Sequence, residues 1–137
     1  KVPFTIFKFR SMRTNTKSVA THLADKGSIT TYGLILRRTK LDELPQFLNV
    51  LRGDMSIVGP RPGLANQVEL TVARDKLGVF DSKPGITGLA QLYGIDMSEP
   101  EALAEADASM LAKMSLKNYF RLIILTLLAR RKDIESF

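Results

Sequence analysis

The stretch from residue 37 to residue 61 constrains this chain more than any other part of its sequence. It reads RRTKLDELPQFLNVLRGDMSIVGPR, and two adjacent acids, Asp42 and Glu43, come directly before an apolar repeat. Four apolar residues at the spacing i, i+3, i+4 and i+7 predict one buried helical face: Leu44, Phe47, Leu48 and Leu51. Gly53 is suited to end this helix in the left-handed conformation. The stretch therefore predicts a short helix with two carboxylates at its N-terminus.

Basic residues surround the acidic pair. Arg37, Arg38 and Lys40 precede it, and Arg61 follows in a GPRP turn. The N-terminus of a helix is also the positive end of the helix dipole. Acids and bases that meet there form a place suited to phosphate and a divalent cation.

Two interpretations of the acidic pair stay open on spacing alone. In the structural one, Asp42 and Glu43 complement the helix dipole, which is worth about 0.3–1 kcal/mol per acid, and the basic residues form a solvated, ion-paired face. In the functional one, one carboxylate attacks phosphorus, the other binds a metal ion, and arginines clamp the phosphate oxygens. An aspartate is ionised at pH 7, but its approach to an anionic diphosphate requires arginine or Mg²⁺ nearby to reduce the repulsion.

The composition narrows the classes of function. The 137 residues are 45% hydrophobic and 25% charged and contain no cysteine, which predicts one globular domain and excludes disulfide frameworks and thiol catalysis. The net charge of +6 favours an anionic partner, such as a nucleotide, a nucleic acid or an acidic lipid surface. Because the chain starts at Lys1 inside a strand-like stretch, we expect it to be a fragment. The sequence contains no run of about 20 apolar residues, the length that a helix needs to cross a bilayer.

The first half of the chain predicts extended segments around the central helix. Residues 2–9 combine aromatic and β-branched side chains and predict a strand, in which Lys8 is either an edge-strand charge or a phosphate contact. Residues 10–28 predict a loop, and residues 29–36 a short extended or helical piece. An apolar run over 55–62 ends in two prolines that favour extended geometry.

The second half predicts mostly helix. A helix is expected over about 64–77, and a capping-box pattern that starts at Ser98 predicts another as far as about Met114. Between them, the three glycines in 84–97 favour a short strand and turns near a ligand. The fold class predicted is a single mixed α/β domain, rich in helix, with a few short strands.

The last predicted helix, about 116–131, is apolar nearly all round. Its segment LIILTLLA (122–129) is flanked by Arg121 and by a basic cluster at 130–132. Eight helical residues cover only about 12 Å, against roughly 30 Å of hydrocarbon, so this segment cannot span a membrane. It is either a core helix or an amphipathic helix in the membrane interface, with its cations at the headgroups.

Three segments carry a resemblance to a known family: KFRSM (8–12), LRRTKLDELPQFLNVLRGDMSIVGPRP (36–62) and KPGITGLAQLYG (83–94). In these segments and their order, the chain resembles the bacterial sugar transferases that are monotopic phosphoglycosyl transferases, which initiate surface-polysaccharide and glycoprotein glycan assembly. The resemblance implies that residues 1–137 are the catalytic domain. It also implies Mg²⁺-dependent, ping-pong transfer of a phospho-sugar from a UDP-sugar to polyprenyl (undecaprenyl) phosphate, with release of UMP.

The resemblance also implies roles for individual residues. Asp42 matches the aspartate that forms the covalent phosphosugar intermediate, and Glu43 matches its metal-associated partner, so both are expected to be catalytic and to bind the metal. Arg37 and Arg61 match arginines associated with substrate phosphate. Lys8 matches the lysine of the KFR motif and is expected to assist them.

A location follows from the same resemblance. Members of the family carry an N-terminal hydrophobic helix that dips into the membrane, and we expect this chain to be the soluble part that lacks it. The expected location is the cytoplasmic face of the bacterial inner membrane, with the last helix at the membrane interface. No motif specifies the transferred sugar or an oligomeric state.

The chain departs from the family pattern at several positions. Lys40 stands where a serine is usual, and Thr31 replaces an arginine. GITGWAQVNGR is present as GITGLAQLYGI, a change that bears on sugar or uridine recognition. Asp54 matches the GDMS aspartate, for which capping of a turn is at least as well supported as catalysis.

Two alternatives without catalysis can be set against the enzyme. A nucleic-acid-binding module would use the net charge and the KFRSMR stretch, but the chain has no recognised nucleic-acid motif, and Asp42 and Glu43 would repel a phosphate backbone. We therefore expect no nucleic-acid partner. A silent membrane-surface scaffold would bind lipid through residues 116–132.

Overall fold

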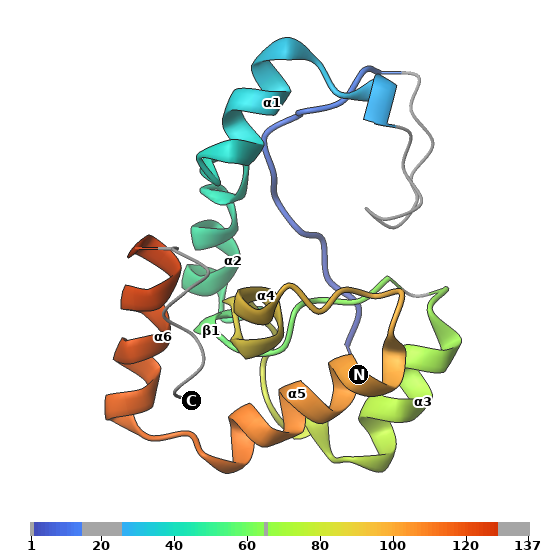
Figure 1. The fold of residues 1–137 in the computed structure, drawn as a ribbon, viewed down its shortest axis with the longest axis vertical. Coiled ribbons are helices and arrows are strands. Elements are labelled where there is room, and N and C mark those ends of the chain that lie inside the picture. The colour runs from blue at the N-terminus through green and yellow to red at the C-terminus, as the bar shows by residue number, and fades with distance from the viewer. Residues whose placement is uncertain (1, 15–25, 65, 129–137) are drawn as a thin grey trace.

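The computed structural model describes residues 2–14, 26–64 and 66–128. In this part the helices are α1 (Thr31–Arg38), α2 (Gln46–Arg52), α3 (Val68–Lys76), α4 (Leu89–Tyr93), α5 (Pro100–Ala112) and α6 (Leu116–Leu128) (Figure 1). The strands are β1 (Ser56–Val58) and β2 (Gly85–Thr87), and 3-10 turns are η2 (Lys26–Ser28), η3 (Leu41–Glu43) and η4 (Val79–Asp81). The predicted mixed, helix-rich α/β architecture with a few short strands is confirmed.

The two strands form a parallel pair connected through α3. Ser56 lies opposite Gly85, and Val58 lies opposite Thr87. The chain segments approach so closely here that a Cβ atom on Gly85 would collide with the backbone of Gly59. The missing side chains therefore allow the GPRP turn after β1 to lie directly against β2.

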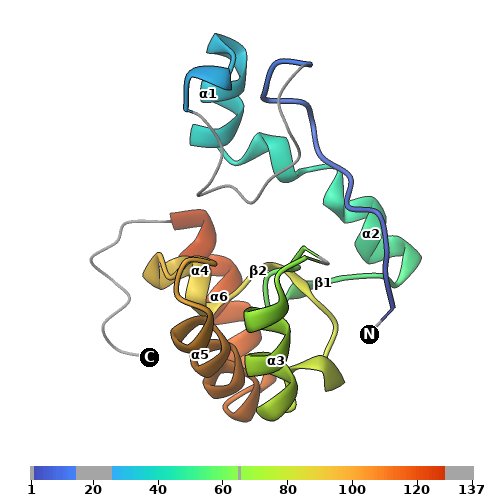
Figure 2. The same ribbon diagram turned by 90° about the vertical axis from the view of Figure 1, so that its right-hand side faces the viewer.

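The hydrophobic core lies where β1 and the helices α3–α6 meet, on the side of the molecule away from α1 (Figure 2). One cluster joins β1, α4, α5 and α6 through Val58, Leu89, Leu92, Met110 and Leu122. A second joins α3, α4 and α5 through Leu70, Ala90 and Leu103. Because α4 contributes to both clusters, the short helix after β2 is fixed from both sides.

Helix α6 has one buried face and one exposed face. Leu122 is fully buried, and the hydroxyls of Tyr119 and Thr126 bond those of Ser56 and Thr87 at 3.1 and 2.6 Å. The opposite face exposes a row of large apolar side chains: Leu116, Phe120, Ile124, Leu127 and Leu128. One face therefore belongs to the core, and the other has no cover in the described part of the chain.

The predicted burial of the central apolar face is wrong. Helix α2 ends at Gly53 in the left-handed conformation as expected, but its apolar residues are 46–84% exposed: Leu44, Phe47, Leu48 and Leu51. The helix instead turns Gln46 and Asn49 inward, and these are 3% and 0% exposed. The physical reason is hydrogen bonding, because Asn49 supplies partners for backbone groups that would otherwise be unpaired.

The predicted strand over residues 2–9 is also wrong, since no strand forms there. The segment is extended but joins no sheet among the described residues. The side chain of Asn49 accepts from the Phe7 N–H at 3.1 Å and donates to the Thr5 carbonyl at 2.7 Å, and the Phe9 N–H donates to the Asp42 carbonyl at 3.0 Å. One side chain thus replaces a neighbouring strand.

The other predicted elements largely agree with the structure. Helices α1, α3, α5 and α6 fall close to the segments predicted for them, and β2 and α4 fill the glycine-rich segment 84–97. The capping box at Ser98 is wrong, since the Ser98 hydroxyl bonds Asp96 at 2.6 Å and Pro100 starts α5. Residues 15–25 of the predicted loop and the basic cluster at 130–132 lie outside the described residues. Among the residues described, no helix is long and apolar enough to cross a membrane.

Lys40 joins α1 to η3 in a left-handed conformation, with φ of 57°, and is the one non-glycine residue with positive φ in the described ranges. Because a Cβ atom is unfavourable there, we expect Lys40→Gly to raise the free energy of unfolding by about 0.5–1 kcal/mol. Urea denaturation measures it. The matched control is Arg38→Gly, which removes a side chain from the last turn of α1 and should lower the free energy by about 1 kcal/mol. A destabilised Lys40→Gly would show that the side chain, not the backbone, determines this turn.

Candidate active site

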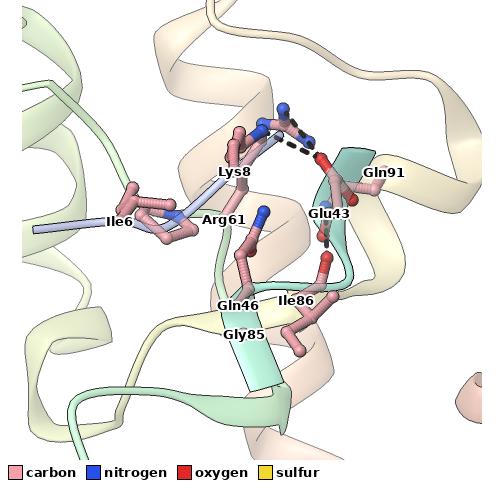
Figure 3. A pocket seen from close by; sticks show the side chains of 9 residues that line it. Ile6, Lys8, Glu43, Gln46, Arg61, Gly85, Ile86 and Gln91 are labelled. Atoms are coloured by element: carbon pink, nitrogen blue, oxygen red, sulfur yellow. Dashed lines mark hydrogen bonds and ion pairs between the residues drawn. The ribbon is translucent and has the colours of Figure 1, made fainter. Parts of the chain in front are cut away.

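Glu43 lies where three separate chain segments meet. Its Oε1 atom is 3.1 Å from Lys8 Nζ on the extended N-terminal segment and 3.7 Å from Arg61 Nη2 in the GPRP turn (Figure 3). The side chains of Lys8, Arg61 and Glu43 are 39%, 31% and 19% exposed. Ion pairs this open to solvent add little stability, so the cluster is better explained by what it can bind.

A small cavity opens beside this cluster. It measures about 40 Å³, and Gln46, Gly85, Ile86 and Gln91 line it together with the three charged residues. Pockets that enclose a whole small molecule typically measure about 300–1,000 Å³. The cavity therefore has room for one small group of a ligand, beside one carboxylate and two cations.

Two of the residues predicted for the site lie outside the cavity lining. Asp42 precedes Glu43 in η3 and is 9% exposed, and its carbonyl accepts from Phe9, but its side chain is not part of the lining. Consecutive residues of a helical turn face different directions. Arg37 lies on α1, where its Nε donates to the Ser11 hydroxyl at 2.9 Å. The structure thus brings Glu43, Arg61 and Lys8 together and leaves Arg37 with a different partner.

Asp54 has surroundings typical of a turn. Its N–H donates to the Asn49 carbonyl at 3.0 Å, and its carboxylate lies 3.5 Å from the Asn49 amide nitrogen. Both contacts hold the turn between α2 and β1. Of the two roles left open for Asp54, capping of a turn is the one that these contacts support.

The donor set for a metal ion is small. Within residues 2–14, 26–64 and 66–128, no three histidine or acidic side chains are grouped closely enough to hold a metal ion by themselves. Mg²⁺ at phosphoryl-transfer sites commonly takes one or two carboxylates and completes its shell with phosphate oxygens and water. Glu43 is the one acid among the described residues that line the cavity, and Asp42 adjoins it in η3, so these two carboxylates fit that requirement in number.

Sequence reasoning missed the buried polar residues that support the site. Gln46 and Asn49 are three residues apart, so they lie on the same face of α2 and form a polar stripe on a helix with mostly apolar residues on its other face. Gly53, which ends the helix, follows four residues after Asn49. That stripe was the available signal. It was outweighed by the stronger apolar pattern on the opposite face.

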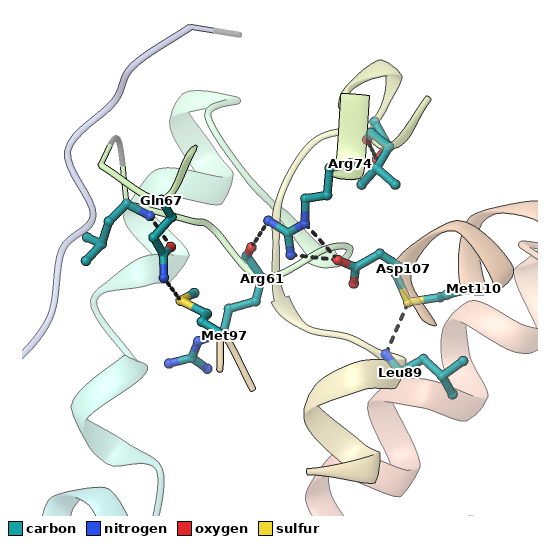
Figure 4. Close-up of polar contacts among 10 residues, drawn as sticks. Arg61, Gln67, Arg74, Leu89, Met97, Asp107 and Met110 are labelled. Atoms are coloured by element: carbon teal, nitrogen blue, oxygen red, sulfur yellow. Dashed lines mark hydrogen bonds and ion pairs between the residues drawn. The ribbon is translucent and has the colours of Figure 1, made fainter. Parts of the chain in front are cut away.

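A buried ion pair behind the cavity holds the turn that carries Arg61. Arg74 on α3 donates to Asp107 on α5 at 3.0 and 2.6 Å, and its Nη1 donates to the Arg61 carbonyl at 2.8 Å (Figure 4). Arg74 and Asp107 are 3% and 1% exposed, and one Asp107 oxygen has no partner in the described structure. Burial raises the pKa of Asp107, and Arg74 opposes this by favouring the charged carboxylate. The pair connects two core helices to the turn that carries Arg61.

Comparison with known proteins gives the family. Residues 1–132 match the model of the family described as bacterial sugar transferase. The chain belongs to the bacterial sugar transferase family. This confirms the resemblance seen in the KFRSM, LDELPQ and GPRP segments.

Individual relatives of this bacterial sugar transferase are similar over parts of their length. EpsL of Bacillus subtilis, described as an uncharacterized sugar transferase, is 42% identical over 105 residues, or 77% of this chain and 52% of EpsL. The UDP-glucose:undecaprenyl-phosphate glucose-1-phosphate transferase of Escherichia coli is 46% identical over 96 residues, or 67% of this chain and 21% of that enzyme. The galactosyl transferase CpsE of Streptococcus agalactiae is 36% identical over 138 residues, or 90% of this chain and 30% of CpsE. The chain therefore spans about half or less of these relatives.

The buried pair of this sugar transferase yields a stability prediction. Arg74→Met leaves the Asp107 charge buried and unpaired, so we expect a loss of about 3–5 kcal/mol near neutral pH. The double variant Arg74→Met/Asp107→Leu should regain most of it, apart from the hydrogen bond to the Arg61 carbonyl, worth about 1 kcal/mol. Urea denaturation of the wild type and the three variants, including Asp107→Leu alone, measures the coupling.

The pH dependence of that loss has a defined sign. Because the pKa of Asp107 is raised in the folded protein, folding favours the protonated carboxyl group. The resulting contribution to the free energy of unfolding is complete below the unfolded pKa of 3.8 and disappears as the pH rises through the higher folded pKa. The loss caused by Arg74→Met should therefore be smaller near pH 4 than at pH 7. Equal losses at both pH values would show that the Asp107 charge does not determine the cost.

Proposed function

We propose that this chain is the catalytic part of a polyprenyl-phosphate phosphoglycosyl transferase. It transfers a phospho-sugar from a UDP-sugar to polyprenyl phosphate and releases UMP, as a first step in polysaccharide or glycoprotein glycan assembly. The observation that carries the proposal is the cavity in which Glu43 meets Arg61 and Lys8. Relatives from this family are named as UDP-glucose:undecaprenyl-phosphate glucose-1-phosphate transferases, which supports the same substrate classes here.

The proposed nucleophile is Asp42. Its carboxylate attacks the phosphorus that carries the sugar, the bond to the UMP oxygen breaks, and a phosphosugar–aspartate intermediate forms. An oxygen of polyprenyl phosphate then attacks the same phosphorus and releases Asp42. Because Asp42 is nearly covered and outside the cavity lining, this step requires η3 or the extended segment over residues 5–9 to shift when the donor binds. In such a shift the backbone hydrogen bond from Phe9 to the Asp42 carbonyl would have to adjust.

The cations reduce the electrostatic cost of bringing two anions together. Arg61 and Lys8 would bind oxygens of the diphosphate and stabilise the charge that develops on the leaving phosphate. Mg²⁺, held by Glu43 and Asp42, would supply further neutralisation of the diphosphate when bound. Arg37 keeps a predicted phosphate role, which requires it to exchange its Ser11 contact for the substrate.

The acceptor is a lipid, so the protein must work at a membrane surface. Two exposed apolar faces suit this: the outer face of α6 and the face of α2 formed by Leu44, Phe47, Leu48 and Leu51. Burial of exposed apolar area stabilises association by roughly 25 cal/mol per Å². We propose that both faces contact the lipid surface, at the cytoplasmic side of the bacterial inner membrane, where soluble UDP-sugar meets the acceptor.

The test of the nucleophile is Asp42→Asn in the protein expressed from its complete open reading frame. Because an amide is a poor nucleophile, we expect UMP release from UDP-sugar and polyprenyl phosphate to fall at least about 10³-fold, with the fold unchanged. Wild-type activity should depend on Mg²⁺ and be lost with a chelator. The matched control is Asp81→Asn, at an exposed residue of η4, which should keep full activity. Full turnover in Asp42→Asn would remove this residue from the mechanism.

The membrane proposal is tested on α6. Phe120→Glu/Ile124→Glu places two charges on its exposed face, where the side chains are 60% and 54% exposed. We expect sedimentation with anionic lipid vesicles to weaken at least tenfold while the melting temperature stays unchanged. The control Ser109→Glu/Ala112→Glu adds the same charge to exposed positions of α5 and corrects for simple repulsion by the anionic lipid. Equal loss in both variants would mean that α6 does not insert.

A further inference from the structure

Gln46 lies at the edge of the candidate active site, where its side chain helps to line the cavity. Its residue is 3% exposed, and it lines the cavity that Glu43, Arg61 and Lys8 share. Figure 3 shows its side chain pointing toward the charged ends of these residues. In the described part of the chain no donor or acceptor pairs with this amide.

Most side-chain amides inside a protein are hydrogen-bonded. The fully buried side-chain atoms without a partner in the described structure are Gln91 Oε1 and Asp107 Oδ1, and the Gln46 amide is not among them because it opens into the cavity. Asn49, one turn further along α2, bonds both Thr5 and Phe7. Gln67, on the opposite side of the GPRP turn, bonds Leu64 and Met97. Gln46 differs from both because its amide reaches a cavity instead of a protein partner.

The surroundings select the class of group that this amide meets. The cavity of about 40 Å³ is too small for a nucleoside or a whole sugar. Two cations line it, and they favour an anionic group. An amide N–H adds a hydrogen-bond donor without adding charge. It can therefore bind an anion without changing the net charge of the cluster formed by Glu43, Lys8 and Arg61.

We propose that Gln46 binds the phosphoryl group that is transferred, by donating a hydrogen bond from its amide to a non-bridging phosphate oxygen. The proposal rests on the function proposed above and adds a residue to its substrate contacts. The bond strengthens as negative charge accumulates on that oxygen in the transition state. Because Gln46 lies in the first turn of α2 and is held by burial, the donor is already oriented before the substrate arrives.

The test compares catalysis with stability in Gln46→Met, which keeps the volume and removes the amide. We expect kcat for UMP release to fall about 10²-fold, with KM for the UDP-sugar changed less than kcat. The melting temperature should stay close to that of the wild type, since no described hydrogen bond within the protein is lost with this amide. A residue with a merely structural role would show the opposite, a lower melting temperature with kcat preserved.

The matched control is Gln67→Met. Its amide is bonded on both sides and lies outside the cavity lining, so its loss should lower the melting temperature and leave kcat unchanged. If Gln46→Met behaves like Gln67→Met, the proposal is overturned.

A binding measurement separates this inference from the proposed function. UDP carries a β-phosphate at the position of the transferred phosphoryl group, and UMP lacks it. Calorimetry should show UDP binding to Gln46→Met at least threefold more weakly than to the wild type, with UMP affinity unchanged. Wild-type protein that releases no UMP would contradict the proposed function, whereas unchanged UDP affinity with unchanged kcat in Gln46→Met would contradict the role of Gln46.

Discussion

Glu43 is held by polar contacts between chain segments that are far apart in the sequence, and the rest of the site depends on that convergence. Lys8 reaches it because Asn49, fully buried, bonds the extended segment at Thr5 and Phe7. Arg61 reaches it because the GPRP turn lies against β2 and is bonded from behind by Arg74. Hydrogen bonds fix direction as well as distance, whereas hydrophobic packing tolerates sliding. A site that must hold two cations against one carboxylate is therefore better positioned by buried polar groups.

The need for buried polar side chains at these positions explains the unusual orientation of α2. A helix of seven residues presents few side chains to the interior, and here the inward positions are taken by Gln46 and Asn49. The apolar side chains must then point outward, where they are exposed to solvent in the isolated chain. A contiguous apolar face that is exposed to water is normally a site of contact with another molecule or a membrane. The inward orientation of Gln46 and Asn49 thus also leaves α2 with the exposed apolar face that is proposed to contact lipid.

Much of the fold was predictable because local signals agreed with the tertiary structure. The left-handed Gly53, the helices α3, α5 and α6 and the short strand β2 follow from spacing and glycine positions. The orientation of α2 was not predictable from the sequence. The rule that apolar residues lie inside fails here because polar side chains of α2 bond the backbone of another segment. The strand predicted for residues 2–9 failed for the same reason, since its partner is the side chain of Asn49.

The candidate site was predictable in part. Glu43, Arg61 and Lys8 were identified from the motifs and do meet, while Arg37 bonds Ser11. Arg74 and Asp107 lie 33 residues apart on different helices, and no local pattern in the sequence connects them. Gln46 was inside the quoted motif but was assigned to the helix and not to the chemistry. The contact between Arg74 and Asp107 depends on how α3 packs against α5. The spacing of residues along a single sequence does not reveal which helices pack together.

The charge balance at Glu43 constrains how the proposed donor can bind. Lys8 and Arg61 both pair with this carboxylate, so a diphosphate that recruits them competes with Glu43 for the same two cations. If the diphosphate took both, Glu43 would be left beside a second anion, which is unfavourable in a partly buried site. On the proposed mechanism, a divalent cation that arrives with the diphosphate would resolve the conflict, because Glu43 could then bind the metal in place of Lys8 and Arg61. On the proposed mechanism, the donor should therefore bind as its metal complex, and the neutral amide of Gln46 can contact the phosphoryl oxygen throughout this exchange without altering the balance.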